Sequence, residues 1–193
     1  VRFSSTHRAQ IKLIRDLFAP YTTPHSWKAK RGTTEIVCLL NKSFKFLVPK
    51  IDEVPSCALN GDNLFWSFFA GYADAEGSFT FKKPKKNGKT RAGYFSIQSQ
   101  DKNTIIGLAS KLESLGIECY GPLISRRAGS IDKRGIRNNR DMWKFDVIKK
   151  ISLWKMINKL SYYIRHSEKV LRLRKIKENI MYRNMIPYAR PIS

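Results

Sequence analysis

Apolar residues change their spacing abruptly in the middle of the chain. A helix of about 14 residues is predicted to begin after Asp62 or Asn63, and it is apolar around most of its circumference, which is typical of a helix buried on several sides. Directly after it, Phe79 and Phe81 alternate with polar side chains, as in a half-buried strand. The pattern therefore predicts a helix that turns into a strand at Gly77.

The rest of the chain continues this alternation of strand and helix patterns. A return strand places Phe95 and Ile97 on one face, and an amphipathic helix follows at 102–115. Further elements are expected at 117–126 (strand), 142–149 (strand), 151–164 (helix) and 167–184 (helix). From residue 62 onward the order is α-β-β-α-β-β-α-α, an α+β fold with helices against one face of an antiparallel sheet.

The first 61 residues carry a weaker version of the same patterns. A helix is predicted at 7–19, a strand at 34–40, and a short helix or strand extension at 43–49. Pro55 and Gly61 interrupt the next segment, which favours a linker. We therefore expect an N-terminal region over 1–61 and a main domain over 62–193 that ends in a basic helix.

Charge narrows the class of partner. The chain has 37 Lys and Arg against 15 Asp and Glu, a net charge of +22, and such an excess favours binding to nucleic acid. An anionic membrane surface is the main alternative, but no segment reaches about 18 uninterrupted apolar residues, so we expect no membrane span. The three cysteines and three histidines show no disulfide or zinc spacing. No secretory signal is visible, which favours an intracellular location in a mitochondrion, a chloroplast or a prokaryotic cytoplasm.

Two predicted hairpin loops carry much of this charge. Together they could clamp a phosphate backbone on either side of the polar sheet face, which could itself read base edges in the major groove. Exposed lysines are common in turns, so each loop alone is weak support. The cations are Lys82, Lys83, Lys85, Lys86, Lys89 and Arg91 in the first loop, and Arg126, Arg127, Lys133, Arg134, Arg137 and Arg140 in the second.

Two acids lie at the end of the apolar helix. Asp74 and Glu76 stand at its C-terminal end, where the helix dipole disfavours negative charge. Acids that merely face water are the simple explanation. Their apolar surroundings favour another one, namely oxygen ligands for a hard divalent cation such as Mg²⁺, which activates water in phosphodiester hydrolysis. Gly71 and Ala75 share a helix face, so a second helix could approach closely there.

Residues 69–77, FAGYADAEG, resemble the signature of the LAGLIDADG homing endonucleases, with Glu76 in place of the second Asp. The resemblance covers about residues 62–175. It implies an α-β-β-α-β-β-α fold whose curved antiparallel sheet forms a DNA-binding saddle. It also implies sequence-specific cleavage of double-stranded DNA, with Mg²⁺ or another divalent cation as cofactor, by an intron-encoded enzyme.

The resemblance also implies roles for individual residues. Glu76 is similar to the metal-binding catalytic acid. Gly77 is expected at the metal site as its backbone neighbour, which lets the helix end meet the scissile phosphate, and Asp74 is either a further metal ligand or a support for the helix end. Gln98 or Gln100 corresponds to a polar residue near the metal, and Lys169, with His166 as the alternative, to a basic residue that assists. The expected DNA contacts of the sheet face and its edges are Thr80, Lys82, Tyr94, Ser96, Gln98, Arg126 and Lys144, and the expected helix interface is Phe68, Gly71, Tyr72 and Ala75.

The motif occurs once, whereas the fold implied by the resemblance needs two motif helices. Residues 7–48 resemble the latter half of an upstream repeat in their helix and strand order. Three explanations stay open: an extension on a homodimer, which we favour, a two-motif protein whose first motif is missing, or a chain that binds without cutting. The alternative function is RNA binding by the same fold, as an intron maturase or a ribosome-associated protein that binds intron or ribosomal RNA.

Overall fold

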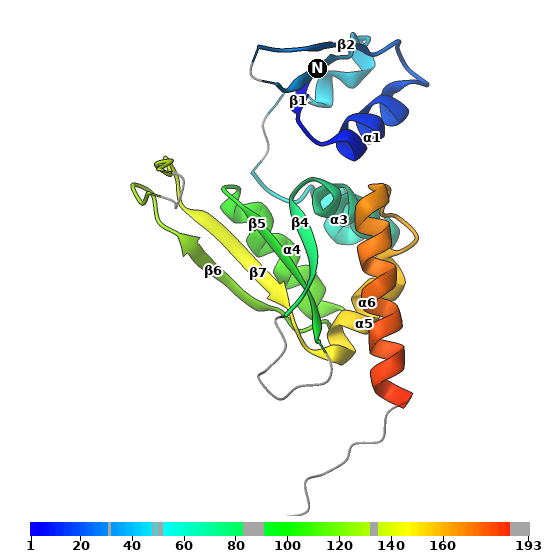
Figure 1. Ribbon diagram of the computed structural model, residues 1–193, viewed down its shortest axis with the longest axis vertical. Helices are drawn as coiled ribbons and strands as arrows, with labels where there is room; N and C mark the ends of the chain where they lie inside the picture. Colours follow the sequence, from blue (N-terminus) through cyan, green and yellow to red (C-terminus); the bar gives the residue numbers. More distant parts are fainter. Residues whose placement is uncertain (31, 48, 50–51, 83–90, 132–134, 186–193) are drawn as a thin grey trace, which may run out of the picture. The chain divides into compact units, whose positions relative to one another are not determined.

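The chain forms two compact units in the computed structural model (Figure 1). The structure describes residues 1–30, 32–47, 49, 52–82, 91–131 and 135–185. One unit comprises Val1–Ile51 with Arg165–Glu168, and the other comprises Asp52–Ile164 with Lys169–Ser193. Each unit has its own antiparallel sheet.

The second unit has the element order predicted from the sequence. Its sheet has four strands in the order β4-β5-β7-β6, all antiparallel to their neighbours. The elements are α2 (Ser56–Asn60), α3 (Asp62–Glu76), β4 (Gly77–Phe81), β5 (Gly93–Ser99), α4 (Lys102–Ser114), β6 (Tyr120–Arg126), β7 (Met142–Val147), α5 (Lys150–Leu160) and α6, which runs over Ser167–Met185. The predicted α+β fold is confirmed.

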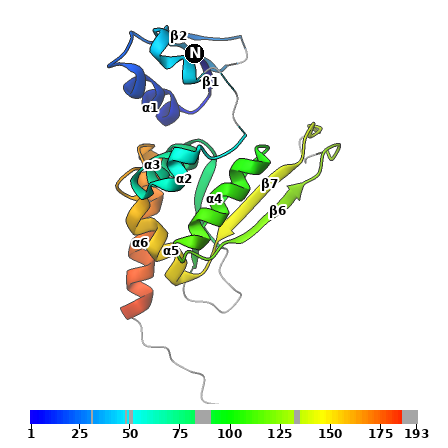
Figure 2. The ribbon, with the colours of Figure 1, turned by 180° about the vertical axis from the view of Figure 1, so that it is seen from behind.

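The core of this unit lies between one face of the sheet and the helices. Phe79, Phe95 and Phe145 come from three adjacent strands and are buried against one another and against α3. The ring of Phe69 in α3 meets Phe95 edge-on at 5.7 Å between centroids. Figure 2 shows α4 in front of the sheet, which it contacts through β5, β6 and β7. Burial of apolar area on this face supplies the main stabilisation of the unit.

The opposite face of the sheet is polar because the strand alternation sends every second side chain there. Along β5 the buried residues alternate with half-buried ones, and Tyr94, Ser96 and Gln98 are the half-buried set. Ser96 lies opposite Asp146 of β7, and Gln98 lies opposite Lys144. The sheet therefore presents one apolar face and one polar face, as its periodicity predicts.

A glycine joins α3 to β4. A β-carbon on Gly77 would lie 2.6 Å from the carbonyl oxygen of Ala73 and 2.9 Å from the ring of Phe95. The Gly77 N–H donates to that same Ala73 oxygen. The helix therefore ends and the strand begins without a connecting loop, which places the last helical residue directly at the edge of the sheet.

The first unit repeats part of this topology. It contains β1 (Arg2–Ser5), α1 (Arg8–Phe18), β2 (His25–Lys28), β3 (Thr34–Val37) and η1 (Lys42–Leu47), a 3-10 helix. Its strands are arranged β1-β3-β2, all antiparallel. The segment β5-α4-β6-β7-α5 of the second unit has the same element order, and its strands are arranged β5-β7-β6.

Three details differ from the sequence analysis. The boundary between the units lies at Asp52 rather than Asp62, because Val54 and Ala58 are buried in the core of the second unit. The expected linker contains the short helix α2, which packs on α3. Strands β1 and β2 were not predicted. Among the helices that the structure describes, none is long and apolar enough to cross a membrane.

Candidate active site at the end of helix α3

The two acids at the end of α3 occupy different environments. Glu76 is the last residue of the helix, and its side chain is exposed at the surface. Asp74 is buried, with 6% of its surface accessible. Glu76 is therefore the carboxylate that a ligand can reach, whereas Asp74 belongs to the packed end of the helix.

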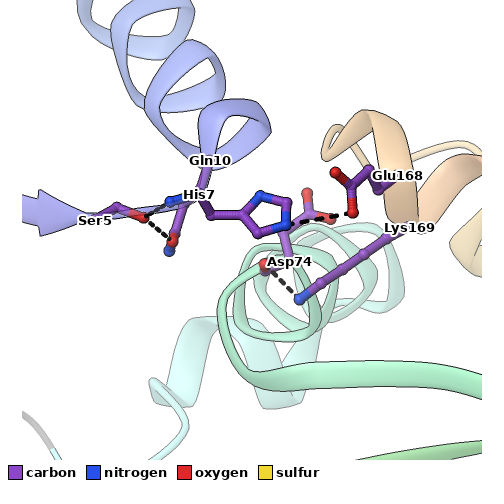
Figure 3. Close-up of polar contacts among 6 residues, drawn as sticks. All are labelled: Ser5, His7, Gln10, Asp74, Glu168 and Lys169. Carbon is purple, nitrogen blue, oxygen red and sulfur yellow. Dashed lines mark hydrogen bonds and ion pairs between the residues drawn. The ribbon is translucent and has the colours of Figure 1, made fainter. Parts of the chain in front are cut away.

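Lys169 of α6 binds the same helix end (Figure 3). Its Nζ donates to the carbonyl oxygen of Ala73 at 2.8 Å and to that of Asp74 at 2.6 Å. The last carbonyls of a helix lack intrahelical partners and carry the negative end of the dipole, so a lysine stabilises them. Burial lowers the pKa of Lys169, whereas the nearby carboxylates of Asp74 and Glu76 act in the opposite direction.

The pKa of Glu76 is raised above its ordinary value of 4.5. The main cause is partial desolvation of the carboxyl by the surrounding protein, even though the side chain reaches solvent. The positive charge of Lys169 lowers this pKa, and the negative charge of Asp101 raises it. The structure thus places a second carboxylate and a lysine within electrostatic reach of Glu76.

Asp101 is a site residue that the sequence analysis missed. It lies between β5 and α4, at the N-cap position of α4, but its side chain makes no capping bond. Its Oδ2 instead accepts hydrogen bonds from the Tyr72 hydroxyl and from Ser99 Oγ, both at 3.2 Å. Burial raises the pKa of Tyr72, which keeps the phenol protonated as a donor. The acid in the run FSIQSQDK was the available signal, since the glutamines beside it were considered instead.

The residues predicted to assist the catalytic acid differ in whether they contact the end of α3. Gln98 donates from its amide to Ser125 Oγ of β6 at 2.6 Å, so this side chain is held on the polar sheet face. Gln100 is exposed just after β5. His166 is buried and groups with the first unit, whereas Lys169 is the basic residue that contacts the end of α3.

The donors at this site fit a hard cation that keeps part of its hydration shell. Within the described residues, no group of three or more His, Cys, Asp and Glu side chains could enclose a metal. Mg²⁺ typically uses one or two protein carboxylates and leaves the other positions to water and phosphate. Glu76 and Asp101, whose charges interact, are two carboxylates at this site that match this requirement.

Solved structures with the same architecture are known. The chain is similar to the LAGLIDADG homing endonuclease I-GzeII in complex with its DNA target, with a TM-score of 0.56 and 10% identity over 97% of this chain and 82% of that one. It is also similar to the meganuclease I-SmaMI bound to uncleavable DNA, with a TM-score of 0.56 and 12% identity over 95% and 78%. The chain has the LAGLIDADG homing endonuclease fold. No family model and no curated protein matches it.

One side of helix α3 is uncovered within the second unit. Leu64 is 56% exposed, Gly71 and Ala75 are exposed, and Phe68 and Tyr72 are half-buried. A β-carbon on Gly71 would meet nothing within 4 Å. All four residues predicted for a helix interface thus reach this side, although the Tyr72 hydroxyl also donates a hydrogen bond to Asp101. Full burial of the helix, which its composition suggested, is not reached among the described residues of the second unit.

The polar face of the four-stranded sheet carries the other predicted side chains. Thr80, Tyr94, Ser96, Gln98 and Lys144 are half-buried on β4, β5 and β7. The exposed cations around this face are Lys82, Arg91, Arg126, Arg127, Arg137 and Arg140. The predicted contacts Lys83, Lys85, Lys86, Lys89 and Arg134, together with Lys133 in the same loop, lie outside the described residues.

Proposed function

We propose that this chain is a divalent-metal-dependent, sequence-specific endonuclease that cuts double-stranded DNA, encoded within an intron. The observation that carries the proposal is Glu76, an exposed carboxylate with a raised pKa at the C-terminal end of an apolar helix. Such a placement costs stability, because the helix dipole and partial desolvation both disfavour the charge. A bound cation removes that cost.

The side chains around Glu76 have different proposed roles. Glu76 and Asp101 would hold the cation, which when bound supplies Lewis-acid stabilisation of the phosphate and a more acidic water. Lys169 holds the end of α3 through two backbone carbonyls and offsets the acids. Asp101 is in turn oriented by Tyr72 and Ser99. Gly77 lets the sheet start at this point, so that DNA on the polar face comes close to Glu76.

The polar sheet face and the net charge support DNA as the substrate. A net charge of +22 favours a polyanion, and a polar β-surface fits the major groove. The similar proteins I-GzeII and I-SmaMI were solved with DNA bound, which agrees with this assignment.

The exposed side of α3 supports a second motif helix as partner. Leu64, Gly71 and Ala75 form an open stripe of apolar and small residues at helical spacing. Two carboxylate sites brought together by two such helices would allow one cut in each DNA strand. We propose that a second copy of the chain supplies that helix.

The test is a cleavage assay with Mg²⁺ on duplex DNA that carries the uninterrupted insertion site. We expect the wild type to cut both strands, and Glu76→Gln to bind the same DNA but to cut it at least about a thousandfold more slowly, a loss of about 4 kcal/mol in transition-state stabilisation. Glu113→Gln is the matched control. Glu113 is an exposed acid in the last turn of α4, at the opposite end of that helix from Asp101, so the variant should cut DNA at the normal rate.

Two results would contradict the nuclease. One is a Glu76→Gln variant that cuts as fast as the wild type, since the metal site would then lie elsewhere. The other is a wild type that cuts no DNA but binds its own intron or ribosomal RNA tightly, which would favour the RNA-binding alternative.

A further inference from the structure

An acid lies within the polar face of the sheet, among side chains that are otherwise neutral or cationic. Asp146 of β7 stands opposite Ser96 of β5 and Tyr120 of β6. Only 8% of its surface is accessible. It lines an open hollow of about 550 Å³ with Thr80, Lys82, Tyr94, Ser96 and Lys144. On a surface that would face phosphates, a carboxylate is unfavourable unless it has a task.

Asp146 is paired with the lysine two residues before it. Residues two apart in a strand share a face, and Lys144 Nζ lies 3.1 Å from Asp146 Oδ2. The lysine side chain is 29% exposed and the acid side chain 11%. The other oxygen, Oδ1, is buried and makes no hydrogen bond within the part of the chain that the structure describes. The acid is therefore the inner member of the pair, and the ammonium is the outer one.

This pairing changes what Lys144 can do. A lysine that only attracts phosphate needs its full charge, but Asp146 neutralises it locally. An ammonium has three N–H donors, and one bond to Asp146 leaves two. The pair also holds a flexible side chain in one place, which reduces the entropy lost when that side chain binds. Lys144 is thus better suited to a fixed pair of acceptors than to a mobile phosphate.

Guanine presents such a pair of acceptors. Its O6 and N7 lie side by side on the major-groove edge, and lysine is one of the side chains that binds both. We propose that Asp146 is a positioning residue that holds Lys144 for a guanine, so that this part of β7 specifies a G·C base pair. The assignment rests on the proposed binding of double-stranded DNA.

The experiment is selection of bound duplexes from a randomised DNA pool by the wild type and by three variants. We expect the wild type to enrich guanine at one position and Lys144→Met to lose that preference about tenfold, with other positions unchanged. Asp146→Asn should relax the same position and steepen the salt dependence by about one unit in the log–log slope, because Lys144 becomes free to bind phosphate.

Glu118→Gln is the matched control. It makes the same charge change and also removes a carboxylate that pairs with a lysine, since Glu118 lies 2.6 Å from Lys149, but both side chains are exposed. Its base preference and salt slope should follow the wild type after correction for one charge.

Three results would overturn the assignment. The first is a Lys144→Met variant that keeps every guanine preference, and this variant also decides the matter if Asp146→Asn does not fold. The second is an Asp146→Asn variant that behaves like Glu118→Gln. A wild type that enriches no duplex sequence would refute the proposed DNA recognition itself, and the base assignment with it.

Discussion

The two units have the same order of elements in part of their chains but very different cores. The sheet β1-β3-β2 repeats the order β5-β7-β6. The hydrophobic residues that are buried in the described part of the first unit are Ile36 and Cys38, whereas every helix of the second unit contributes to one large buried cluster. A shared topology therefore does not imply a shared density of packing.

The difference follows from the area that each sheet offers to its helices. The strands of the first unit have four residues each, whereas β5 and β6 have seven. Helix α1 is amphipathic but buries none of its side chains fully, whereas α4 buries Ile105, Leu108 and Leu112. The second unit also has α3, which brings Phe65, Trp66 and Phe69 into the core. Apolar burial scales with area, so short strands without a motif helix leave a thin core.

The largest expected change in the free energy of unfolding comes from a comparison of one aromatic residue in each unit. Phe69 is fully buried and stacks on Phe65 at 5.8 Å, so Phe69→Ala should lower the free energy of unfolding by about 3–5 kcal/mol. Phe3 is half-buried beside Phe18 at 5.4 Å, and Phe3→Ala should cost only about 1 kcal/mol. Urea denaturation followed by circular dichroism measures both. Equal losses would show that the first unit is packed as well as the second.

Intermediate changes in stability are expected for two glycines, Gly71 within α3 and Gly77 directly after it. Gly77→Ala should destabilise the protein by about 1–3 kcal/mol, because the new methyl group meets Ala73 and Phe95. Gly71→Ala should instead stabilise the isolated chain by up to about 1 kcal/mol, because alanine is the better helix former and its methyl group meets nothing. Melting temperatures measure both changes.

A larger substitution at Gly71 tests the proposed helix partner. If a second α3 packs on Gly71, Gly71→Leu should leave the chain folded but weaken self-association in sedimentation and slow cleavage. A Gly71→Leu variant that associates and cuts like the wild type would show that this side of α3 has no partner.

The smallest expected effect is a pH-dependent change in melting temperature, and it comes from a comparison of one acid in each unit. Hydrogen bonds from Ser4 and Arg2 lower the pKa of Glu35 below 4.5, so Glu35 stabilises the fold above that pH and loses this contribution as the pH falls through its lowered pKa. Burial raises the pKa of Glu76, so its ionisation costs stability at neutral pH. Glu35→Gln should therefore lower the melting temperature at pH 7, and Glu76→Gln should raise it.

Melting curves from about pH 3 to pH 7 measure this contrast. The Glu76 difference should vanish once the pH falls below the ordinary glutamate pKa, and the Glu35 difference should shrink as the pH falls through its lowered pKa. Metal-dependent cleavage should fall as the pH drops through the raised pKa of Glu76, because protons and the cation compete for the carboxylate. A Glu76→Gln variant that melts below the wild type at neutral pH would mark Glu76 as a structural acid like Glu35.

Much of the second unit could be predicted from its residue pattern. The change of period at Gly77, the amphipathic stripe of α4 and the alternation along β5 each depend on neighbours in sequence, and each element formed as expected. Strand β2, with the sequence HSWK, was missed because all four residues are exposed and no apolar alternation marks them. Helix α2 was missed because Pro55 and Gly61 flank only five residues.

The candidate site was predicted in part for the same reason. Glu76 was found because its position at the end of an apolar helix is a local feature of the sequence. Asp101 and Asp146 were not found, because an acid just after a strand or within one has no sequence pattern of its own. Their roles depend on contacts such as the bond from Tyr72 to Asp101, across 29 residues.

The sequence by itself determined where the helices and strands of the second unit form, which acid ends the apolar helix, and that the surface is strongly basic. Only the tertiary structure decided that Lys169 meets the end of α3 across 96 residues, that Asp101 acts on Glu76, and that Asp146 lies beneath Lys144. Periodicity reports which side of an element is buried, since it depends on the geometry of that element alone. Which side chains then meet depends on how the elements pack, and no local pattern contains that information.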